Sequence, residues 1–319
     1  MGMFEPRLLH PVHEFGHRTV DFSRRIAVMA IVNRTPDSFY DSGSTFGLHE
    51  AVGAALRAVG AGADWVDIGG VPFAPGPALP AAAEAERVVP VIEAVRAESD
   101  VVISADTFLP AVAEAAIEAG ADVINDTTGL ADPDLARVVA DGGVHVVLTH
   151  SLARPRTVYP RPRYGDVVAE VVDFLRRRVD TALAAGVAPE KIIVDPGHDL
   201  NKNTLHTLEV TRRFDEVAGL GYPALAAVSN KDFIGEALDV SKRERTAGSL
   251  AAAAMCAMNG ARIVRMHGVE ESVQAMRLIE AAMGWREPAY LRHNMGEVNE
   301  PAADPPSPVR APRVREARR

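Results

Sequence analysis

Cysteine is almost absent from this chain of 319 residues, because Cys256 is its single example. A disulfide within the chain is therefore excluded, and in the Ala-rich stretch 251–260 we predict a small buried side chain rather than a nucleophile. Long hydrophobic runs are also missing, since no apolar stretch reaches the roughly 18 residues that a membrane-spanning helix needs. The first residues lack the apolar core of a signal peptide, and we therefore expect a cytoplasmic protein with no membrane partner.

Basic residues are in the minority: 34 Lys and Arg stand against 43 Asp and Glu, and the net charge is −9 at pH 7. A general nucleic-acid-binding surface needs a concentrated basic face, so we expect no nucleic-acid partner. Five arginines follow Ser307, in a segment rich in Pro and Ala that cannot form a core. We predict a Pro/Arg-rich, disordered tail over 285–319; weak tethering to an acidic partner is the alternative.

Apolar runs of strand length are what the chain has in abundance, and hydrophobic residues make up 47% of it. Each run ends in polar residues. The eight runs cover residues 26–33, 63–70, 101–107, 122–128, 144–150, 192–197, 224–231 and 262–267. Near-continuous Val, Ile and Ala are typical of parallel strands that are buried on both faces.

Stretches with helical spacing alternate with these runs. We predict helices over residues 48–61, 80–98, 110–120, 132–141, 166–185, 204–219, 244–259 and 269–283. Eight right-handed βαβ units close an α/β fold, the (β/α)₈ or TIM barrel, whose active site lies at the C-terminal ends of the strands. We therefore predict one barrel domain over 21–284, preceded by an N-terminal extension over 1–20.

Three polar side chains end otherwise apolar strands: Asp106, Asn125 and Asp195. Each is costly to bury without a partner, so their convergence in one barrel indicates a ligand rich in N–H groups, such as a flat nitrogen heterocycle. Capping of neighbouring loops, or pairing with Lys231, is the alternative for any one of them.

Cationic side chains on the last two strands indicate an anion. Arg265 and His267 are two residues apart and so face the same side of one strand, and Lys231 ends the strand before it. In a closed barrel Asn33 on the first strand is their neighbour, which favours a phosphate or diphosphate ligand. Pairing of Arg265 with Asp232 or a helix carboxylate is the alternative.

The first strand continues into the polar loop 33–43, which reads NRTPDSFYDSG. A long polar loop over a barrel mouth is a candidate lid, and Asp37 could place an acidic group over the bound ligand. Asn33 could offer its amide oxygen to a metal. A plain turn is the alternative.

Seven motifs, in register over residues 26–283, resemble the dihydropteroate synthase family. They read AIVNRTPDSFYDSG, ADWVDIGG, ISADT, ADVINDTTGL, IIVDPG, SNKDFIG and ARIVRMHGVEESVQAMRLIEA. The resemblance implies a barrel transferase of folate biosynthesis, usually a homodimer. Such an enzyme joins 6-hydroxymethyl-7,8-dihydropterin diphosphate to p-aminobenzoate and releases diphosphate with the help of Mg²⁺.

The resemblance also implies roles for individual residues. It assigns the pterin ring to Asp106, Asn125, Asp195 and Lys231. Arg265 would stack on the ring, and together with Asn33 and His267 it would hold the diphosphate and the magnesium ion, with Asn33 as metal ligand. Asp37 would stabilise the pterin methylene cation, so that Asp37, Lys231 and Arg265 are the predicted catalytic groups.

Four departures from the family pattern fall on the side of the second substrate. Residues 69–76 read GGVPFAPG where the family has GGESTRPG, and Asn230 replaces an arginine. Residues 198–202 read HDLNK in place of an aromatic, glycine-rich stretch, and Thr149 replaces a methionine. Losing two charge-assisted contacts costs about 3 to 6 kcal/mol.

This pattern resembles the divergent second copy of the synthase that some bacteria carry. Three functions stay open on sequence alone. The first is a working synthase with a remodelled aminobenzoate pocket. The second is a paralogue that keeps a pterin and diphosphate site but lacks robust synthase activity. The third is a related pterin-dependent methyltransferase, against which the TPDSF loop and the RMH pair speak.

Overall fold

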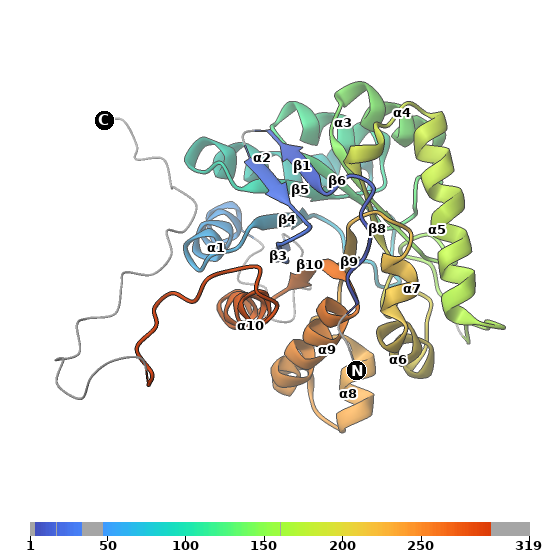
Figure 1. The fold of residues 1–319 in the computed structure, drawn as a ribbon. Coiled ribbons are helices and arrows are strands. Elements are labelled where there is room, and N and C mark those ends of the chain that lie inside the picture. The colour runs from blue at the N-terminus through green and yellow to red at the C-terminus, as the bar shows by residue number, and fades with distance from the viewer. Residues whose placement is uncertain (1–3, 17, 34–46, 160, 295–319) are drawn as a thin grey trace, which may run out of the picture.

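Eight parallel strands close into a barrel at the centre of the molecule, and helices surround it (Figure 1). The computed structural model describes residues 4–16, 18–33, 47–159 and 161–294. Round the barrel the strands are β10 (Ala261–Met266), β3 (Ala27–Asn33), β4 (Trp65–Gly69), β5 (Val102–Asp106), β6 (Val123–Asp126), β7 (His145–Thr149), β8 (Ile192–Asp195) and β9 (Ala224–Ala226). Strands consecutive in sequence are neighbours, as βαβ units require, so the predicted TIM barrel is confirmed.

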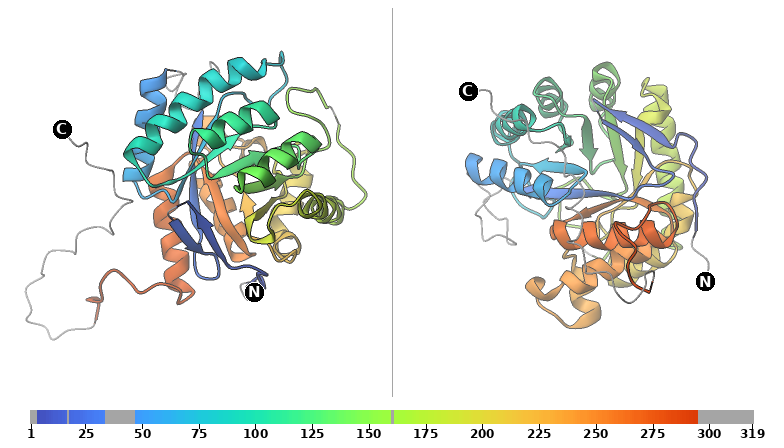
Figure 2. Two further views of the ribbon diagram at one scale, coloured as in Figure 1. Left: turned by 90° about the horizontal axis from the view of Figure 1, so that it is seen from above. Right: turned by 60° about the vertical axis from the view of Figure 1, so that its left-hand side comes forward.

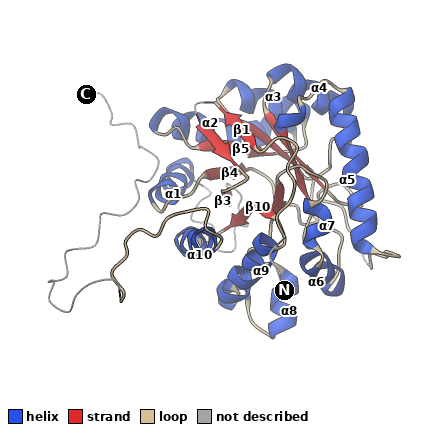
Figure 3. Cartoon of the chain, viewed as in Figure 1, coloured by secondary structure: helices blue, strands red, loops and turns tan. Residues whose placement is uncertain are grey.

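The helices form the outer layer, which Figure 3 separates by colour from the strands inside. They are α1 (Leu48–Gly60), α2 (Ala81–Glu98), α3 (Pro110–Glu118), α4 (Pro133–Gly142), α5 (Val167–Ala184), α6 (Thr204–Arg212), α7 (Phe214–Ala218), α8 (Asp232–Leu238), α9 (Thr246–Met258) and α10 (Val269–Ala282). Local sequence sets several starts. Pro110 and Pro133 lie at first helical positions, and the Asp132 and Asp166 carboxylates accept hydrogen bonds from backbone N–H groups of the first turn.

Alternation along the strands divides the core in two. Side chains that point outward, such as Val28, Val66 and Ile103, pack against the helices. Side chains that point inward, such as Met29 and Trp65, fill the barrel interior. A residue at a strand end therefore faces either the helices or the barrel mouth according to its parity.

An antiparallel hairpin of β1 (Val12–Phe15) and β2 (Arg18–Asp21) covers the N-terminal end of the barrel, as the two views of Figure 2 help to show. Phe15 is buried; its ring stacks on His145 with centroids 4.0 Å apart and lies 5.6 Å from Trp65. The sequence predicts an N-terminal extension over residues 1–20. Much of that segment forms the hairpin or leads directly into its first strand.

Two helical segments differ from the sequence prediction. The stretch predicted as one helix over 204–219 is two helices, because the backbone of Arg213 leaves the helical region at φ −104° and ψ 34°. Helix α8 was not predicted, since its seven residues are too few to show a period. At the other end of the chain, Arg262 lies over the Trp285 ring at 4.7 Å, so packing on the barrel reaches residue 285. Most of the predicted tail, residues 295–319, lies outside the described residues.

Within the described ranges, the structure holds no helix that is both long and apolar enough to cross a membrane.

Candidate functional site

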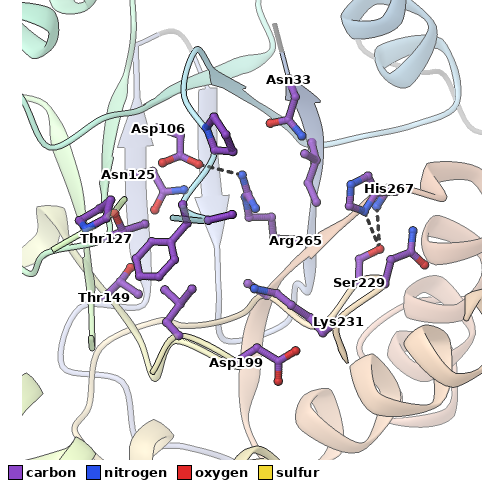
Figure 4. A pocket seen from close by; sticks show the side chains of 18 of the residues that line it. Asn33, Asp106, Asn125, Thr127, Thr149, Asp199, Ser229, Lys231, Arg265 and His267 are labelled. Atoms are coloured by element: carbon purple, nitrogen blue, oxygen red, sulfur yellow. Dashed lines mark hydrogen bonds and ion pairs between the residues drawn. The ribbon is translucent and has the colours of Figure 1, made fainter. Parts of the chain in front are cut away.

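A cavity of about 1240 Å³ opens at the C-terminal ends of the barrel strands (Figure 4). Seven of the eight predicted site residues line it. They are Asn33, Asp106, Asn125, Asp195, Lys231, Arg265 and His267. The eighth, Asp37, lies outside the described residues.

Strand register brings the first polar groups into one row. Asn33 pairs with Gly69, Gly69 with Asp106, and Asp106 with Asn125 across four adjacent strands. Gly69 places no side chain between its two neighbours; a Cβ there would be in van der Waals contact with both, 3.4 Å from the Asn33 Oδ1 and 3.5 Å from the Asp106 Cβ. The row thus offers amide and carboxylate groups side by side at the mouth.

Arg265 reaches across the barrel to two carboxylates. Its Nε donates to Asp67 Oδ2 at 2.6 Å, and its Nη2 donates to Asp106 Oδ2 at 3.0 Å. Asp67 is fully buried; it also accepts from Asn125 Nδ2 at 3.1 Å and from the Ser104 hydroxyl. Every oxygen of this buried carboxylate is therefore in use, and it fixes the orientation of both Arg265 and Asn125.

The charge on Asp106 is finely balanced. Its pKa is raised to about 7, first by burial and then by the nearby Asp67 carboxylate, against the lowering effect of Arg265. Asp106 can therefore exchange a proton near neutral pH. As a carboxylate it accepts N–H groups, and as an acid it donates one hydrogen bond.

Asp195 and Lys231 face the cavity from β8 and from the segment after β9 (Figure 4 labels Lys231). Asp195 Oδ1 accepts from the Gly197 backbone N–H at 2.7 Å, and burial raises its pKa to about 6. Lys231 Nζ donates to the His198 carbonyl oxygen at 3.1 Å, and burial lowers its pKa. The loop-capping role considered for Asp195 is real, but its carboxylate still lines the cavity.

Ser229 orients His267. The Ser229 hydroxyl oxygen accepts from the backbone N–H of His267 at 3.1 Å and lies 2.9 Å from its Nδ1. When the hydroxyl donates to Nδ1, the ring proton resides on Nε2, and His267 then acts as a hydrogen-bond donor. A donor next to Arg265 suits a phosphate oxygen.

Lys202 is a buried cation that the sequence interpretation left without a role. Only 6% of it is exposed, and its Nζ donates to the carbonyl oxygens of Gly197 and Leu200 at 3.0 and 3.2 Å and lies 2.8 Å from His150 Nδ1. Burial lowers the pKa of Lys202 to about 7 and that of His150 to about 2, so the imidazole is the neutral acceptor. Lys202 holds together the loop that follows Asp195.

The altered loop after β4 lies against the loop after β7. Arg156 donates to the carbonyl oxygens of Pro72, at 3.2 Å, and Ala74. Its backbone N–H donates to the Phe73 carbonyl oxygen at 3.0 Å. The Arg156 guanidinium therefore links the two loops. The side chains that the loop after β4 contributes to the cavity wall are apolar.

Asn230 occupies a backbone position that an arginine adopts only with strain. Its φ is +56°, in the left-handed region that Asn tolerates better than most residues. Its carbonyl oxygen accepts from Arg245 at 2.9 Å, and the same guanidinium donates to Asp232 at 2.8 Å. Arg265 does not take Asp232 as partner; the structure pairs it with Asp67 and Asp106 instead.

The principal residue that sequence reasoning missed is Asp67. It was noted as a polar strand end but not placed in the site, because its role depends on contacts with strands β5, β6 and β10. The sequence did contain one signal for this role. The apolar run 63–70 has two charged residues: Asp64 near its start and Asp67 in its middle. A carboxylate in the middle of a buried strand needs buried partners.

The residues present fit Mg²⁺ as an ion that arrives with a diphosphate. Among the described residues, no group of three or more His, Cys, Asp or Glu could hold a metal ion. Magnesium usually keeps several waters and takes few protein oxygens when phosphates share it. Asn33, which lines the same cavity as Arg265 and His267, could supply one such oxygen from its side-chain amide.

Comparison with known proteins agrees with this geometry. Residues 29–267 match the family described as pterin binding enzyme. The chain is 45% identical over 270 residues to the "Inactive dihydropteroate synthase 2" of Mycobacterium leprae (strain TN), covering 83% of this chain and 93% of that protein. It is 40% identical over 261 residues to the dihydropteroate synthase of Escherichia coli (strain K12), covering 82% and 93%.

Solved structures give the same result. Xanthomonas albilineans dihydropteroate synthase with 4-aminobenzoic acid is similar at a TM-score of 0.80 and 38% identity, covering 86% of this chain and 98% of that one. Yersinia pestis dihydropteroate synthase in a sulfonamide drug complex is similar at 0.82 and 36%, covering 86% and 99%. Since the family match and these relatives span most of the chain, the protein belongs to the pterin-binding enzymes, as a member of the dihydropteroate synthase family.

Proposed function

We propose that the protein is a transferase that condenses 6-hydroxymethyl-7,8-dihydropterin diphosphate with p-aminobenzoate and releases diphosphate. The observation that carries this proposal is the meeting, in one cavity, of three acceptors with two cations. The acceptors are Asp106, Asn125 and Asp195, and the cations are Lys231 and Arg265. A flat ring that carries amino and ring N–H groups on one edge and a diphosphate on the other matches both sets.

The pterin side binds through groups that the barrel already holds in position. Asp106 and Asp195 accept N–H groups of the ring, and Asn125, oriented by Asp67, can donate and accept. Arg265, fixed by two carboxylates, presents the face of its guanidinium to a planar ligand. Since these groups are in place before the ligand arrives, little ordering of side chains opposes binding.

The leaving group departs towards Arg265 and His267. As the bond between the pterin methylene carbon and the diphosphate oxygen breaks, negative charge develops on that oxygen. The positive charge of Arg265 and the N–H group of His267 stabilise this negative charge. Asn33 would hold a magnesium ion that arrives with the diphosphate, and the ion would neutralise part of this charge. Asp37, which follows β3 in the sequence, would stabilise the methylene cation. The amine nitrogen then bonds to the methylene carbon and loses its proton.

The alternative is a paralogue that keeps the pterin and diphosphate site without robust synthase activity. Two observations favour it. The part of the cavity wall that the loop after β4 forms is apolar. Arg156 donates its hydrogen bonds to backbone carbonyl oxygens of that loop rather than to a substrate. In addition, the relative with 45% identity is named inactive.

The test is direct. The purified full-length protein is incubated with 6-hydroxymethyl-7,8-dihydropterin diphosphate, p-aminobenzoate and Mg²⁺, and 7,8-dihydropteroate and diphosphate are measured. We expect both products in equal amounts, and loss of both when a chelator removes the metal. Absence of product, with pterin binding retained in calorimetry, would establish the paralogue. Complementation of a synthase-deficient strain gives the same answer in cells.

We further propose a cytoplasmic homodimer in which residues 21–284 form the catalytic barrel and the Arg-rich end of the chain takes no part in transfer. Light scattering of the purified protein measures the oligomeric state. Deleting residues 295–319 is expected to leave the turnover number unchanged, and a fall in turnover would give this segment a role in the reaction.

A further inference from the structure

Apolar side chains line the side of the cavity that the proposed function assigns to the amine. Val71, Pro72 and Phe73 come from the loop after β4, Phe108 follows β5, and Tyr159 belongs to the loop after β7. Such a wall buries an aromatic ring well but offers no positive charge to a carboxylate. This inference rests on the proposed function in one respect: it takes an aryl amine as the second substrate.

Cations near this side are engaged by the protein itself. Arg156 donates to backbone carbonyls, Arg245 donates to Asp232 and to the Asn230 carbonyl, and Lys202 is held by its own loop. Lys242 also lines the cavity. Its contribution is therefore part of the test below.

Asp199 adds a negative charge at this place. Its Oδ2 accepts from the backbone N–H groups of Asp232 and Phe233 at 2.6 and 3.3 Å, and its side chain lines the cavity beside Lys231 (Figure 4). Of the charges around Lys231, Asp199 has the largest effect in raising its pKa, against the stronger lowering by burial. Lys231 thus already has an anionic neighbour before any substrate binds.

The position of Asp199 is built into its loop. Asp199 and Asn201 have φ of +63° and +49°, and Asn201 Oδ1 accepts from the backbone N–H groups of Leu152 and Ala153 at 2.9 and 3.0 Å. Lys202 closes the same loop through the Gly197 and Leu200 carbonyls. A ligand carboxylate could displace the Asp199 carboxylate only by breaking its hydrogen bonds from the Asp232 and Phe233 N–H groups, so we expect the two negative charges to coexist.

We propose that Asp199 makes the amine pocket selective against carboxylates, so that the pocket accepts p-aminobenzoate but binds an uncharged aryl amine of the same shape more tightly. The apolar wall supplies the attraction for the ring, and the fixed carboxylate supplies the repulsion that weakens binding of an acid. Transfer to an uncharged amine follows the same course: the methylene carbon loses diphosphate, bonds to the amine nitrogen, and the amine proton goes to solvent.

Two probes of nearly equal shape test this selectivity: p-aminobenzoate and p-aminobenzamide. Their dissociation constants are measured by calorimetry on the full-length protein in the presence of 6-hydroxymethylpterin, diphosphate and Mg²⁺. We expect the amide to bind about tenfold more tightly than the acid, the size of one unfavourable charge contact. Equal affinity, tighter binding of the acid, or failure of the amide to bind overturns the proposal.

Variants identify the residue responsible. Asp199→Asn keeps the left-handed backbone and an acceptor oxygen but removes the charge, and we expect it to tighten binding of the acid about tenfold and leave the amide unchanged. Asp199→Gly provides a second variant compatible with the same φ. Asp173→Asn, an exposed position on α5, controls for the change in net charge. If Lys242→Gln changes the ratio and Asp199→Asn does not, the proposal is wrong.

Failure of the proposed function gives a different result. If neither amine yields a transfer product while the amide still binds more tightly than the acid, the proposed transferase activity is wrong and the selectivity stands. If p-aminobenzoate is converted at the higher kcat/KM, the transferase activity stands and the selectivity is wrong.

Discussion

The two halves of the barrel rim are built in different ways. On the proposed pterin side, Asp67, Asp106 and Arg265 lie on strands, and Arg265 joins the two carboxylates across the barrel. On the proposed amine side, most of the groups that depart from the family pattern lie on loops, as Phe73 and Asp199 do; Thr149, at the end of β7, is the exception. A strand residue has neighbours on both sides and changes only at a cost to the barrel. A loop residue can change while the barrel remains, so we expect substitutions to alter the amine side more readily than the pterin side.

The largest effect should come from breaking the network that supports the pterin side. Arg265→Met leaves the fully buried Asp67 without its cation. We expect the free energy of unfolding to fall by about 3 to 5 kcal/mol, together with loss of pterin binding. Urea denaturation measures the first and calorimetry the second. Arg137→Met removes an exposed arginine as the matched control; a loss of similar size there would contradict a special role for Arg265.

Removing one acceptor should weaken the pterin without weakening the fold. Asp106→Asn takes away a carboxylate that is buried beside Asp67 and therefore relieves repulsion while it removes a charged hydrogen-bond acceptor. We expect affinity for 6-hydroxymethylpterin to fall about 10- to 100-fold, with stability unchanged or slightly raised. Unchanged affinity would remove Asp106 from the pterin set, whatever the effect on the fold.

The pH dependence of pterin affinity tests the pterin side by itself. The folded pKa of Asp106 is raised to about 7 and that of Asp195 to about 6, and both must be ionised to accept two N–H groups. As pH falls from 8 to 6, these carboxyls become protonated, so pterin affinity should fall about tenfold. In Asp106→Asn the slope above pH 6 should disappear. A wild-type affinity that is flat with pH would show that Asp106 is not the titrating acceptor.

The smallest effect is expected on the amine side. Asn230→Arg restores the arginine of the family pattern but forces it into a backbone with φ of +56°. We expect a loss of about 1 kcal/mol in the free energy of unfolding and no change in pterin affinity. Thermal unfolding and calorimetry check the two parts. A large fall in pterin affinity would mean that the two halves are not independent.

The sequence predicted the barrel because its strands are apolar on both faces and so stand out as short runs. The hairpin β1 and β2 was not predicted, since four-residue strands such as Val12–Phe15 alternate too briefly to be distinguished from loop. Helix α8 was missed for the same reason of length. The break at Arg213 has no breaker residue to announce it and depends on how α6 and α7 pack.

The sequence also predicted which side chains reach the cavity, because strand ends in a barrel point to one rim. What it could not predict is how those side chains pair. Arg265 pairs with Asp67 and Asp106, which lie far from it in the sequence. No local sequence pattern predicts such contacts across the barrel. The capping of Asp232 by Asp199 likewise depends on a loop conformation that starts with a non-glycine residue at positive φ.

The hairpin at the barrel floor has a consequence for the shortest chain that can carry the site. Trp65, which Phe15 covers, donates its indole N–H to Ser104 at 2.8 Å, and Ser104 in turn donates to Asp67. A hydrogen-bonded column thus runs through the barrel from the floor to the carboxylate that orients Arg265. A truncated protein that contains only residues 29–267, the part that matches the family, would lack the hairpin. Trp65 would then be exposed to water, and we expect the hydrogen bonds from Trp65 through Ser104 to Asp67 to be less well ordered. We therefore expect the minimal pterin-binding unit to include the hairpin, whose first strand begins at Val12, upstream of the first barrel strand at Ala27.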